Sequence, residues 1–194
     1  MKKQIPNLLT LLNLFCGIIA LRYALSQAFD WALFWFFLGI TLDFFDGFVA
    51  RILKVSSPLG KELDSLADLV TSGLVPGQVM YWLISYSAAH YGDALHFFLP
   101  FAGYLITLAS AYRLACFNLD TRQSDSFIGL PTPANALFII SLGVIVQQAV
   151  YLKAIPLWGT LLITGISCVL LNSNLRLLAL KFKDFSIKNN LLKY

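Results

Sequence analysis

The chain alternates between long stretches of apolar residues and shorter polar connections along most of its length. A helix that crosses a bilayer needs about 20 mostly apolar residues. Most connections are short, the exception being the polar segment 118–132, and short connections favour antiparallel neighbours in a bundle. The pattern therefore predicts an all-α, polytopic membrane helix bundle that forms a single domain over residues 1–194. The six predicted spans are 5–26, 29–53, 60–87, 95–117, 133–151 and 155–175.

The composition strengthens the membrane interpretation. Hydrophobic residues make up 58% of the chain, charged residues only 12%, and the mean hydropathy is +0.74, whereas a soluble domain carries about 25% charged residues. The net charge of +4 suggests nucleic acid at first sight, but the basic residues form no stripe, so we expect no nucleic-acid partner. Cys16, Cys116 and Cys168 lie singly inside apolar stretches, which is typical of small buried side chains rather than disulfides or metal ligands.

The distribution of lysine and arginine predicts an orientation. With a cytoplasmic N-terminus, all the basic residues except Arg22 and Lys153 fall on the cytoplasmic side, as the positive-inside rule requires. Trp31, Trp82 and Trp158 then lie near the outer ends of their helices, where interfacial aromatic residues gather. We therefore expect an integral protein of the cell membrane, surrounded by membrane lipids, with its N-terminus in the cytoplasm.

Four aspartates lie in the second and third predicted spans. Asp43 and Asp46 are three residues apart and Asp64 and Asp68 are four apart, so each pair shares one helix face. Because the short loop 52–59 makes the two helices antiparallel, the two faces can meet just inside the membrane. A charged side chain there costs at least about 2.5 kcal/mol unless it is paired or hydrated. Bound divalent cations, Mg²⁺ or Mn²⁺, would offset these charges and suit all-oxygen ligands.

The aspartates belong to a longer motif at positions 43–68, which reads Asp-x2-Asp-Gly-x2-Ala-Arg-x8-Gly-x3-Asp-x3-Asp. It resembles the signature of the CDP-alcohol phosphotransferase family at every fixed position. The resemblance implies two divalent metal ions that bridge to the CDP pyrophosphate, with Asp68 as the general base. The metal ligands would be Asp43, Asp46, Asp64 and Asp68. The residues expected to contact the CDP-lipid are Pro6, Asn7, Gly47, Ala50, Arg51, Ser56, Ser57 and Gly60.

Two later segments resemble one branch of that family, the phosphatidylserine synthases. They read Arg-Leu-Ala-Cys-Phe-Asn at 113–118 and Phe-Ile-Gly-Leu-Pro-Thr-Pro at 127–133. The resemblance implies transfer of the phosphatidyl group of CDP-diacylglycerol to the hydroxyl of L-serine, giving phosphatidylserine and CMP. A serine carboxylate needs a cationic or multi-donor partner, so Arg113, Asn118 and Arg122 are candidate acceptor-binding residues. Cys116 stands where this branch often has arginine.

Simpler roles remain open for several of these residues. The aspartates could cap helices or pair with the basic residues near the loop 52–59. Arg113 could extend to lipid headgroups, and Arg122 could be solvated. The family resemblance also implies a homodimer, for which Gly73 and Gly77 offer small-xxx-small spacing.

Two alternative functions also remain open. The acceptor could be glycerol-3-phosphate, an inositol phosphate or another alcohol, although a phosphorylated acceptor would need a denser basic pocket. The chain could instead be a cation transporter that uses the aspartates as an ion site. Such a protein would spread its acidic residues over several helices broken near the membrane centre, whereas here they cluster beside a basic loop.

Overall fold

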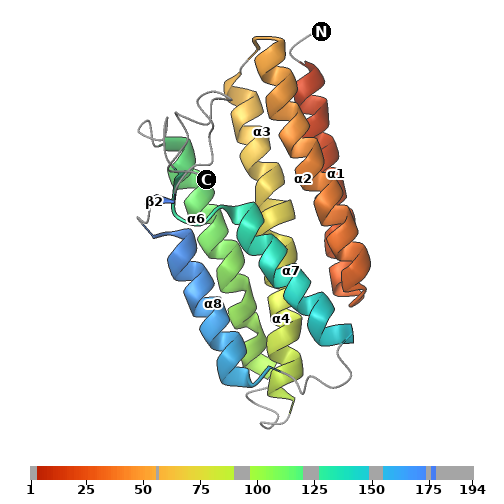
Figure 1. The fold of residues 1–194 in the computed structure, drawn as a ribbon, viewed down its shortest axis with the longest axis vertical. Coiled ribbons are helices and arrows are strands. Elements are labelled where there is room, and N and C mark those ends of the chain that lie inside the picture. The colour runs from red at the N-terminus through yellow and green to blue at the C-terminus, as the bar shows by residue number, and fades with distance from the viewer. Residues whose placement is uncertain are drawn as a thin grey trace, which may run out of the picture.

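A computed structural model describes residues 4–55, 57–89, 97–119, 127–148, 155–173 and 176–177. These residues form an elongated bundle whose helices run roughly along one axis (Figure 1). The α-helices are α1 (Gln4–Leu25), α2 (Phe29–Ile52), α3 (Pro58–Asp68), α4 (Val75–Ala88), α6 (Leu105–Leu119), α7 (Thr132–Gln148) and α8 (Leu157–Leu171). A π-helix, η1 (Leu69–Leu74), joins α3 to α4, and a 3₁₀-helix, η2 (Leu99–Tyr104), leads into α6.

Each of the six predicted segments contains a helix among the residues that the structure describes. Three helical stretches are long and apolar enough to cross a membrane, judged by length and composition: Gln4–Leu25, Phe29–Ile52 and Leu99–Leu119. Two further apolar helices, α7 and α8, are shorter. The number of segments that cross the membrane and the side on which the N-terminus lies remain predictions.

The third predicted segment is one helical run from Pro58 to Ala88, widened in the middle by η1. The cause lies in Pro76, near the start of α4. Proline lacks a backbone N–H, and its ring clashes with the carbonyl four residues earlier in an α-helix. The π-turn that precedes it relieves this clash without ending the helix. The sequence pattern predicted the length of this helix but not its change of geometry.

The lower half of the bundle in Figure 1 contains the apolar core, to which α1, α2, α4, α6, α7 and α8 all contribute. Phe36, Met80 and Ile84 are fully buried members of this cluster. The ring of Phe29 meets the ring of Trp82 edge to face, with 4.8 Å between their centroids. Burial of such large side chains is the main source of packing energy in the bundle.

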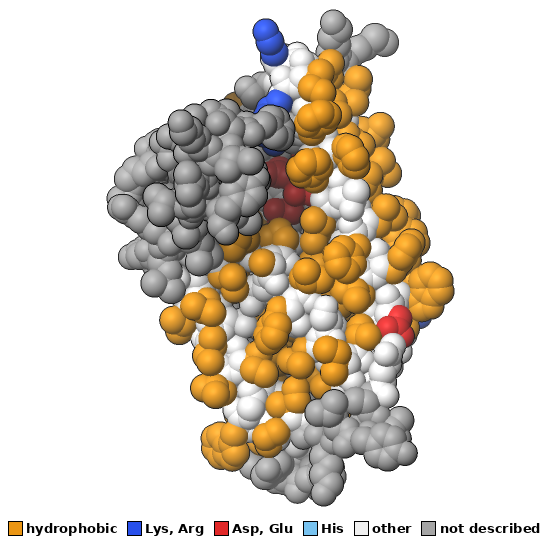
Figure 2. All heavy atoms as spheres, in the orientation of Figure 1, with side chains coloured by type: hydrophobic (Ala, Val, Ile, Leu, Met, Phe, Trp, Pro, Cys, Tyr) orange, Lys and Arg blue, Asp and Glu red, His pale blue; other side chains and the backbone are white. Residues whose placement is uncertain are grey.

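The outer face of the bundle is also strongly apolar. Large side chains cover the side seen in Figure 2, and Phe34, Leu108 and Trp158 are more than half exposed. Soluble monomers rarely expose large contiguous apolar patches. This surface fits contact with lipid tails, in agreement with the composition.

Gly73 and Gly77 do not offer a free surface for a homodimer contact. Both are buried, and both face the helical stretch of η2 and α6 within the same chain. An added Cβ at Gly73 would lie 3.2 Å from Ser110 Cβ, and one at Gly77 would collide with the Thr107 hydroxyl. The small-residue spacing therefore serves close packing inside the protomer, and the part of the prediction that placed a dimer contact there is wrong.

The bundle is all-α as predicted, with one small addition among the described residues. Two-residue strands, β1 (Phe127–Ile128) and β2 (Arg176–Leu177), pair antiparallel. Gly129 has a φ of +78°, which glycine adopts without strain. The Leu130 N–H then donates to the Leu170 carbonyl at 3.0 Å, which ties the start of α7 to the end of α8.

Candidate active site

Three carboxylates meet in the upper half of the bundle. Asp43 on α2 and Asp64 and Asp68 on α3 each place a carboxylate oxygen within 4.8 Å of the others. All three side chains are half-buried, and Figure 2 shows acidic side chains recessed below the surface in this half. α1 packs against both α2 and α3, so the carboxylates face one another across a space that α1 borders.

Asp46 takes a different position. Its side chain is only 8% exposed, and Oδ2 accepts a hydrogen bond of 2.5 Å from the Thr10 hydroxyl on α1. Thr10 Oγ1 also lies 3.1 Å from the Pro6 carbonyl oxygen, so the hydroxyl is held in place. Asp46 is still close enough to repel the other three carboxylates. All four therefore form one electrostatic cluster, in which Asp46 is tied to α1.

The nearby basic side chains point elsewhere. Arg51 is exposed and its Nε donates to the Gly47 carbonyl at 3.0 Å. Lys61 Nζ donates to the Asn118 carbonyl oxygen at 2.5 Å. Among the described residues, the charged groups that act on Asp43 and Asp68 are the other aspartates. This arrangement argues against the interpretation in which ion pairs explain the acidic residues.

The cluster fits a divalent cation. Converging carboxylates without a basic partner repel one another and lose hydration, which is costly unless a cation binds. Mg²⁺ and Mn²⁺ prefer oxygen donors of this kind and retain water or phosphate oxygens as further ligands. Asp43, Asp64 and Asp68 are the residues whose oxygens lie close enough to share an ion.

Sequence analysis overlooked two polar residues of α1. Thr10 and Asn13 follow Asn7 at intervals of three, so the three residues lie on neighbouring positions of one helix face. Thr10 binds Asp46, and Asn13, which is fully buried, interacts with Asp68. A search for polar residues that share the face of Asn7 in this otherwise apolar helix would have found both.

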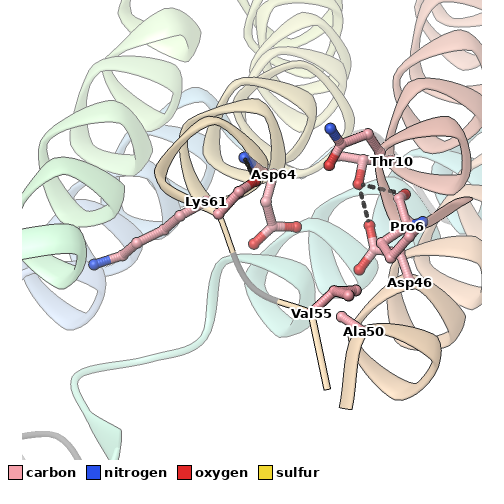
Figure 3. A pocket seen from close by; sticks show the side chains of 10 residues that line it. Pro6, Thr10, Asp46, Ala50, Val55, Lys61 and Asp64 are labelled. Carbon is pink, nitrogen blue, oxygen red and sulfur yellow. Dashed lines mark hydrogen bonds between the residues drawn. The ribbon is translucent and has the colours of Figure 1, made fainter. Parts of the chain in front are cut away.

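A cavity of about 330 Å³ opens beside Asp46 and Asp64. Its volume falls within the range of about 300–1,000 Å³ that is typical of small-molecule sites. Figure 3 shows the carboxyl groups of Asp46 and Asp64 on opposite sides of this space, while Lys61 extends away from it. The lining residues are Pro6, Asn7, Thr10, Asp46, Ala50, Val55, Ser57, Gly60, Lys61 and Asp64.

Five residues predicted to contact the CDP-lipid line this cavity, which is the larger of two that border the carboxylates: Pro6, Asn7, Ala50, Ser57 and Gly60. Gly47 and Arg51 are not part of its lining. Ser56 lies outside the described residues. The structure thus brings together most of the predicted set from three separate elements, the starts of α1 and α3 and the end of α2.

The start of α3 owes its position to capping and close packing. The Ser57 hydroxyl accepts a hydrogen bond of 3.0 Å from the Gly60 N–H, and Pro58 occupies the first turn, which is a favourable helix start. An added Cβ at Gly60 would lie 3.1 Å from the Asn7 side-chain oxygen. Glycine therefore lets α3 approach α1 at the edge of the cavity.

A second, smaller cavity of about 130 Å³ lies on another side of the cluster. Its lining residues are Asp68, Arg113, Leu114, Phe117, Pro131, Thr132 and Pro133. Arg113 is largely buried, and its Nη2 donates to the Gly129 carbonyl at a long distance of 3.5 Å. A carboxylate and a guanidinium thus border the same small space.

The other predicted acceptor residues are placed differently. Asn118 Nδ2 donates a hydrogen bond of 2.8 Å to the Ser65 hydroxyl, and the Asn118 backbone carbonyl accepts one from Lys61 Nζ. It therefore ties the end of α6 to α3 and does not line the smaller cavity. Arg122 lies outside the described residues.

Comparison with known proteins agrees with the motif. The family profile described as CDP-alcohol phosphatidyltransferase matches residues 3–167. A Bacillus subtilis protein named CDP-diacylglycerol–serine O-phosphatidyltransferase is 37% identical over 142 residues, which cover 71% of this chain and 74% of that protein.

Proteins of the same name give similar matches in other organisms. The Helicobacter pylori J99 protein is 37% identical over 70% of this chain and 55% of its own length. The Saccharomyces cerevisiae protein is 32% identical over 79% of this chain and 58% of its own length. The chain thus matches little more than half of these two relatives. Since the profile spans the helices that carry the carboxylates and both cavities, the chain belongs to the CDP-alcohol phosphatidyltransferase family.

Proposed function

We propose that the protein is a CDP-diacylglycerol–serine O-phosphatidyltransferase, which forms phosphatidylserine and CMP. The observation that carries the proposal is the position of the carboxylates between two cavities of unequal size. Asp46 and Asp64 line the larger cavity and Asp68 lines the smaller one. A nucleotide-linked donor and a small acceptor need two such spaces on either side of the reacting phosphorus. The names of the relatives support serine as the acceptor.

The CDP group of the donor would occupy the larger cavity. The N-terminus of α3 borders this space at Ser57 and Gly60, and the N-terminus of a helix attracts phosphate through its dipole and free N–H groups. Two Mg²⁺ or Mn²⁺ ions would be held by Asp43, Asp46, Asp64 and Asp68. When bound, they would neutralise the pyrophosphate oxygens and stabilise the departing CMP.

Serine would occupy the smaller cavity. Its hydroxyl would lie at Asp68 and its carboxylate at Arg113, because guanidinium groups bind carboxylates strongly. The serine oxygen forms a bond to the phosphorus that carries the diacylglycerol, and Asp68 accepts the hydroxyl proton as general base. The bond from this phosphorus to the oxygen bridging to CMP breaks, and CMP leaves with the electron pair.

The membrane setting follows the same logic. We propose six membrane-spanning segments, a cytoplasmic N-terminus and an active site at the cytoplasmic face of the cell membrane. The diacyl tails would remain among lipids along the apolar outer face. We also propose a homodimer, formed through a surface other than the one at Gly73 and Gly77.

The test is a CMP-release assay on protein purified in detergent, supplied with CDP-diacylglycerol and Mn²⁺ or Mg²⁺, with and without serine. We expect CMP release that needs both metal and serine, and its loss in Asp68→Asn. Asp30→Asn is a matched control, because Asp30 is exposed at the other end of α2 and binds Gln148.

Release that depends on glycerol-3-phosphate or an inositol phosphate, but not on serine, would keep the family chemistry and overturn the acceptor. Absence of metal-dependent release with every alcohol, from protein shown to be folded, would overturn the enzymatic proposal.

A further inference from the structure

Asn13 is a buried amide in the middle of an apolar helix. Its side chain is fully buried on α1, and a buried amide without hydrogen bonds is costly in free energy. Thr71 in η1 supplies one partner: its hydroxyl lies 3.1 Å from Asn13 Oδ1 and 3.4 Å from the Asn13 backbone carbonyl. Both of these Asn13 atoms are acceptors, so the threonine hydroxyl is the donor.

The threonine fixes which way the amide faces. Because Oδ1 accepts from Thr71, the amide nitrogen must point to the other side. Asn13 Nδ2 is buried and has no hydrogen-bond partner among the described residues, and the Asp68 carboxyl group is close enough to interact with the Asn13 side chain. The reversed amide would turn its oxygen toward the Asp68 carboxylate, which would be repulsive. The Asn13 nitrogen is therefore held as a donor toward Asp68.

The surroundings leave Asn13 and Thr71 little freedom. An added Cβ at Gly39 on α2 would lie 2.9 Å from Asn13 Oδ1, and an added Cβ at Gly17 would collide with the Thr71 hydroxyl. Thr71 is almost completely buried and lies in the π-turn that begins directly after Asp68. The Asn13 and Thr71 side chains, closely covered by two glycines, thus contact each other, and the Asn13 side chain interacts with Asp68.

We propose that Asn13 and Thr71 are positioning residues for Asp68. In this role the Asn13 amide would donate to one carboxylate oxygen of Asp68 and leave the other to face the smaller cavity, while Thr71 keeps the amide in the required orientation. This inference rests on the proposed function, in which Asp68 takes the proton of the acceptor hydroxyl. It assigns roles to two residues outside the aspartate motif.

Four variants test the proposal through steady-state kinetics of CMP release. Asn13→Ala removes the donor, Asn13→Asp replaces it by an acceptor of the same shape, and Thr71→Val removes the hydroxyl at nearly constant volume. We expect kcat to fall by about 10–100-fold in each, the usual effect of removing a group that orients a ligand. Thr71→Ser keeps the hydroxyl and should retain most of the wild-type kcat.

The KM for CDP-diacylglycerol distinguishes positioning from general damage. Asn13 and Thr71 do not line the larger cavity, so this KM should stay within about threefold of wild type if only Asp68 is misplaced. Thr41→Val is the matched control, since the Thr41 hydroxyl binds only the Phe37 carbonyl of its own helix, at 2.8 Å. It should leave both kcat and KM unchanged.

The outcomes distinguish failure of the positioning role from failure of the proposed function. A kcat within twofold of wild type in folded Asn13→Ala and Thr71→Val would overturn the positioning role. So would a full retention of kcat in Asn13→Asp, because shape alone would then suffice. If wild-type protein releases no CMP in the presence of serine, the proposed function is overturned, and the positioning role in that reaction is overturned with it.

Discussion

The two halves of the bundle are built on opposite principles. In the lower half, Phe36, Leu83 and Ile84 are at most 1% exposed and belong to one apolar cluster. In the upper half, Asp64 and Asp68 remain half-buried beside cavities, and both lie close to the carboxyl group of Asp43. α2 and the helical run from α3 to α4 pass through both halves (Figure 1).

This contrast shows where the molecule gains stability and where it loses some. Close apolar packing in the lower half is favourable by itself. The clustered carboxylates are unfavourable by themselves and become useful when a cation and phosphate oxygens complete the site. Substitutions in the two halves should therefore affect different measurements, and four experiments test whether they do.

The largest expected effect is on activity, from Asp43→Asn. A metal site contributes several kcal/mol to transition-state stabilisation, and a factor of ten in rate corresponds to about 1.4 kcal/mol. CMP release should therefore fall by about 10³-fold. In metal-free buffer, the same variant should unfold at no lower temperature than wild type, because an uncharged amide replaces an acidic group that is unfavourably placed among other aspartates. Thermal unfolding in detergent measures this temperature. A strong loss of stability in Asp43→Asn would contradict the conclusion that the clustered carboxylates are unfavourable for folding.

Leu83→Ala should have the opposite profile. A leucine truncated in a packed core costs about 2–5 kcal/mol in free energy of unfolding, whereas kcat per folded molecule should be unchanged. Chemical denaturation in detergent gives the free energy, and CMP release gives kcat. Leu108→Ala is the control, because Leu108 is 65% exposed on α6. Equal destabilisation by both variants would show that the lower core is not the main source of stability.

Bound metal should stabilise the folded protein only through the aspartates of the upper half. A ligand present at 100 times its dissociation constant stabilises the folded state by about 2.7 kcal/mol. Mn²⁺ should therefore raise the unfolding temperature of wild type, and EDTA should reverse the rise. Leu83→Ala should show the same rise from a lower baseline, whereas Asp43→Asn should lose most of it. A full rise in Asp43→Asn would mean that Mn²⁺ binds elsewhere.

The smallest effect is expected from Ser57, which both caps α3 and lines the larger cavity. Ser57→Ala removes the N-terminal cap of α3 and should cost about 1 kcal/mol of stability. Ser57→Asp keeps a capping oxygen but adds a negative charge to the larger cavity. It should retain stability and raise the KM for CDP-diacylglycerol. An unchanged KM in Ser57→Asp would argue against a phosphate-bearing ligand beside the start of α3.

The sequence predicted the helices and most of the candidate site for physical reasons that can be named. Spans of apolar residues have a fixed minimum length, so the ends of α1 and α2 match the prediction closely. The i,i+4 spacing places Asp64 and Asp68 on one face whatever the neighbours are. The antiparallel turn after α2 then brings Asp43 to them.

Other features depend on three-dimensional partners that the sequence does not name. Asn118 was predicted to bind the acceptor, and the structure adds contacts that the sequence did not indicate, from its Nδ2 to Ser65 and from Lys61 to its backbone carbonyl. The spacing of Gly73 and Gly77 is compatible with contacts inside or between protomers, and only the structure shows α6 against them. In the sequence, Asn13 is one polar residue in a mostly apolar helix. Only the fold brings Thr71 and Asp68 close to it.

The π-helix has a consequence for how the length of this chain can vary. A π-turn holds about one residue more than an α-turn, so the helix beyond it is rotated by roughly 100°. Asp64 and Asp68 on α3 can thus face the site while Val75 and Val79 on α4 face the core. Deleting any one residue of Leu69–Leu74 would restore the ordinary register and turn one of these faces away. The segment between Asp68 and Pro76 should therefore not tolerate an insertion or a deletion, even at a half-buried position such as Val70 where another apolar residue should be accepted.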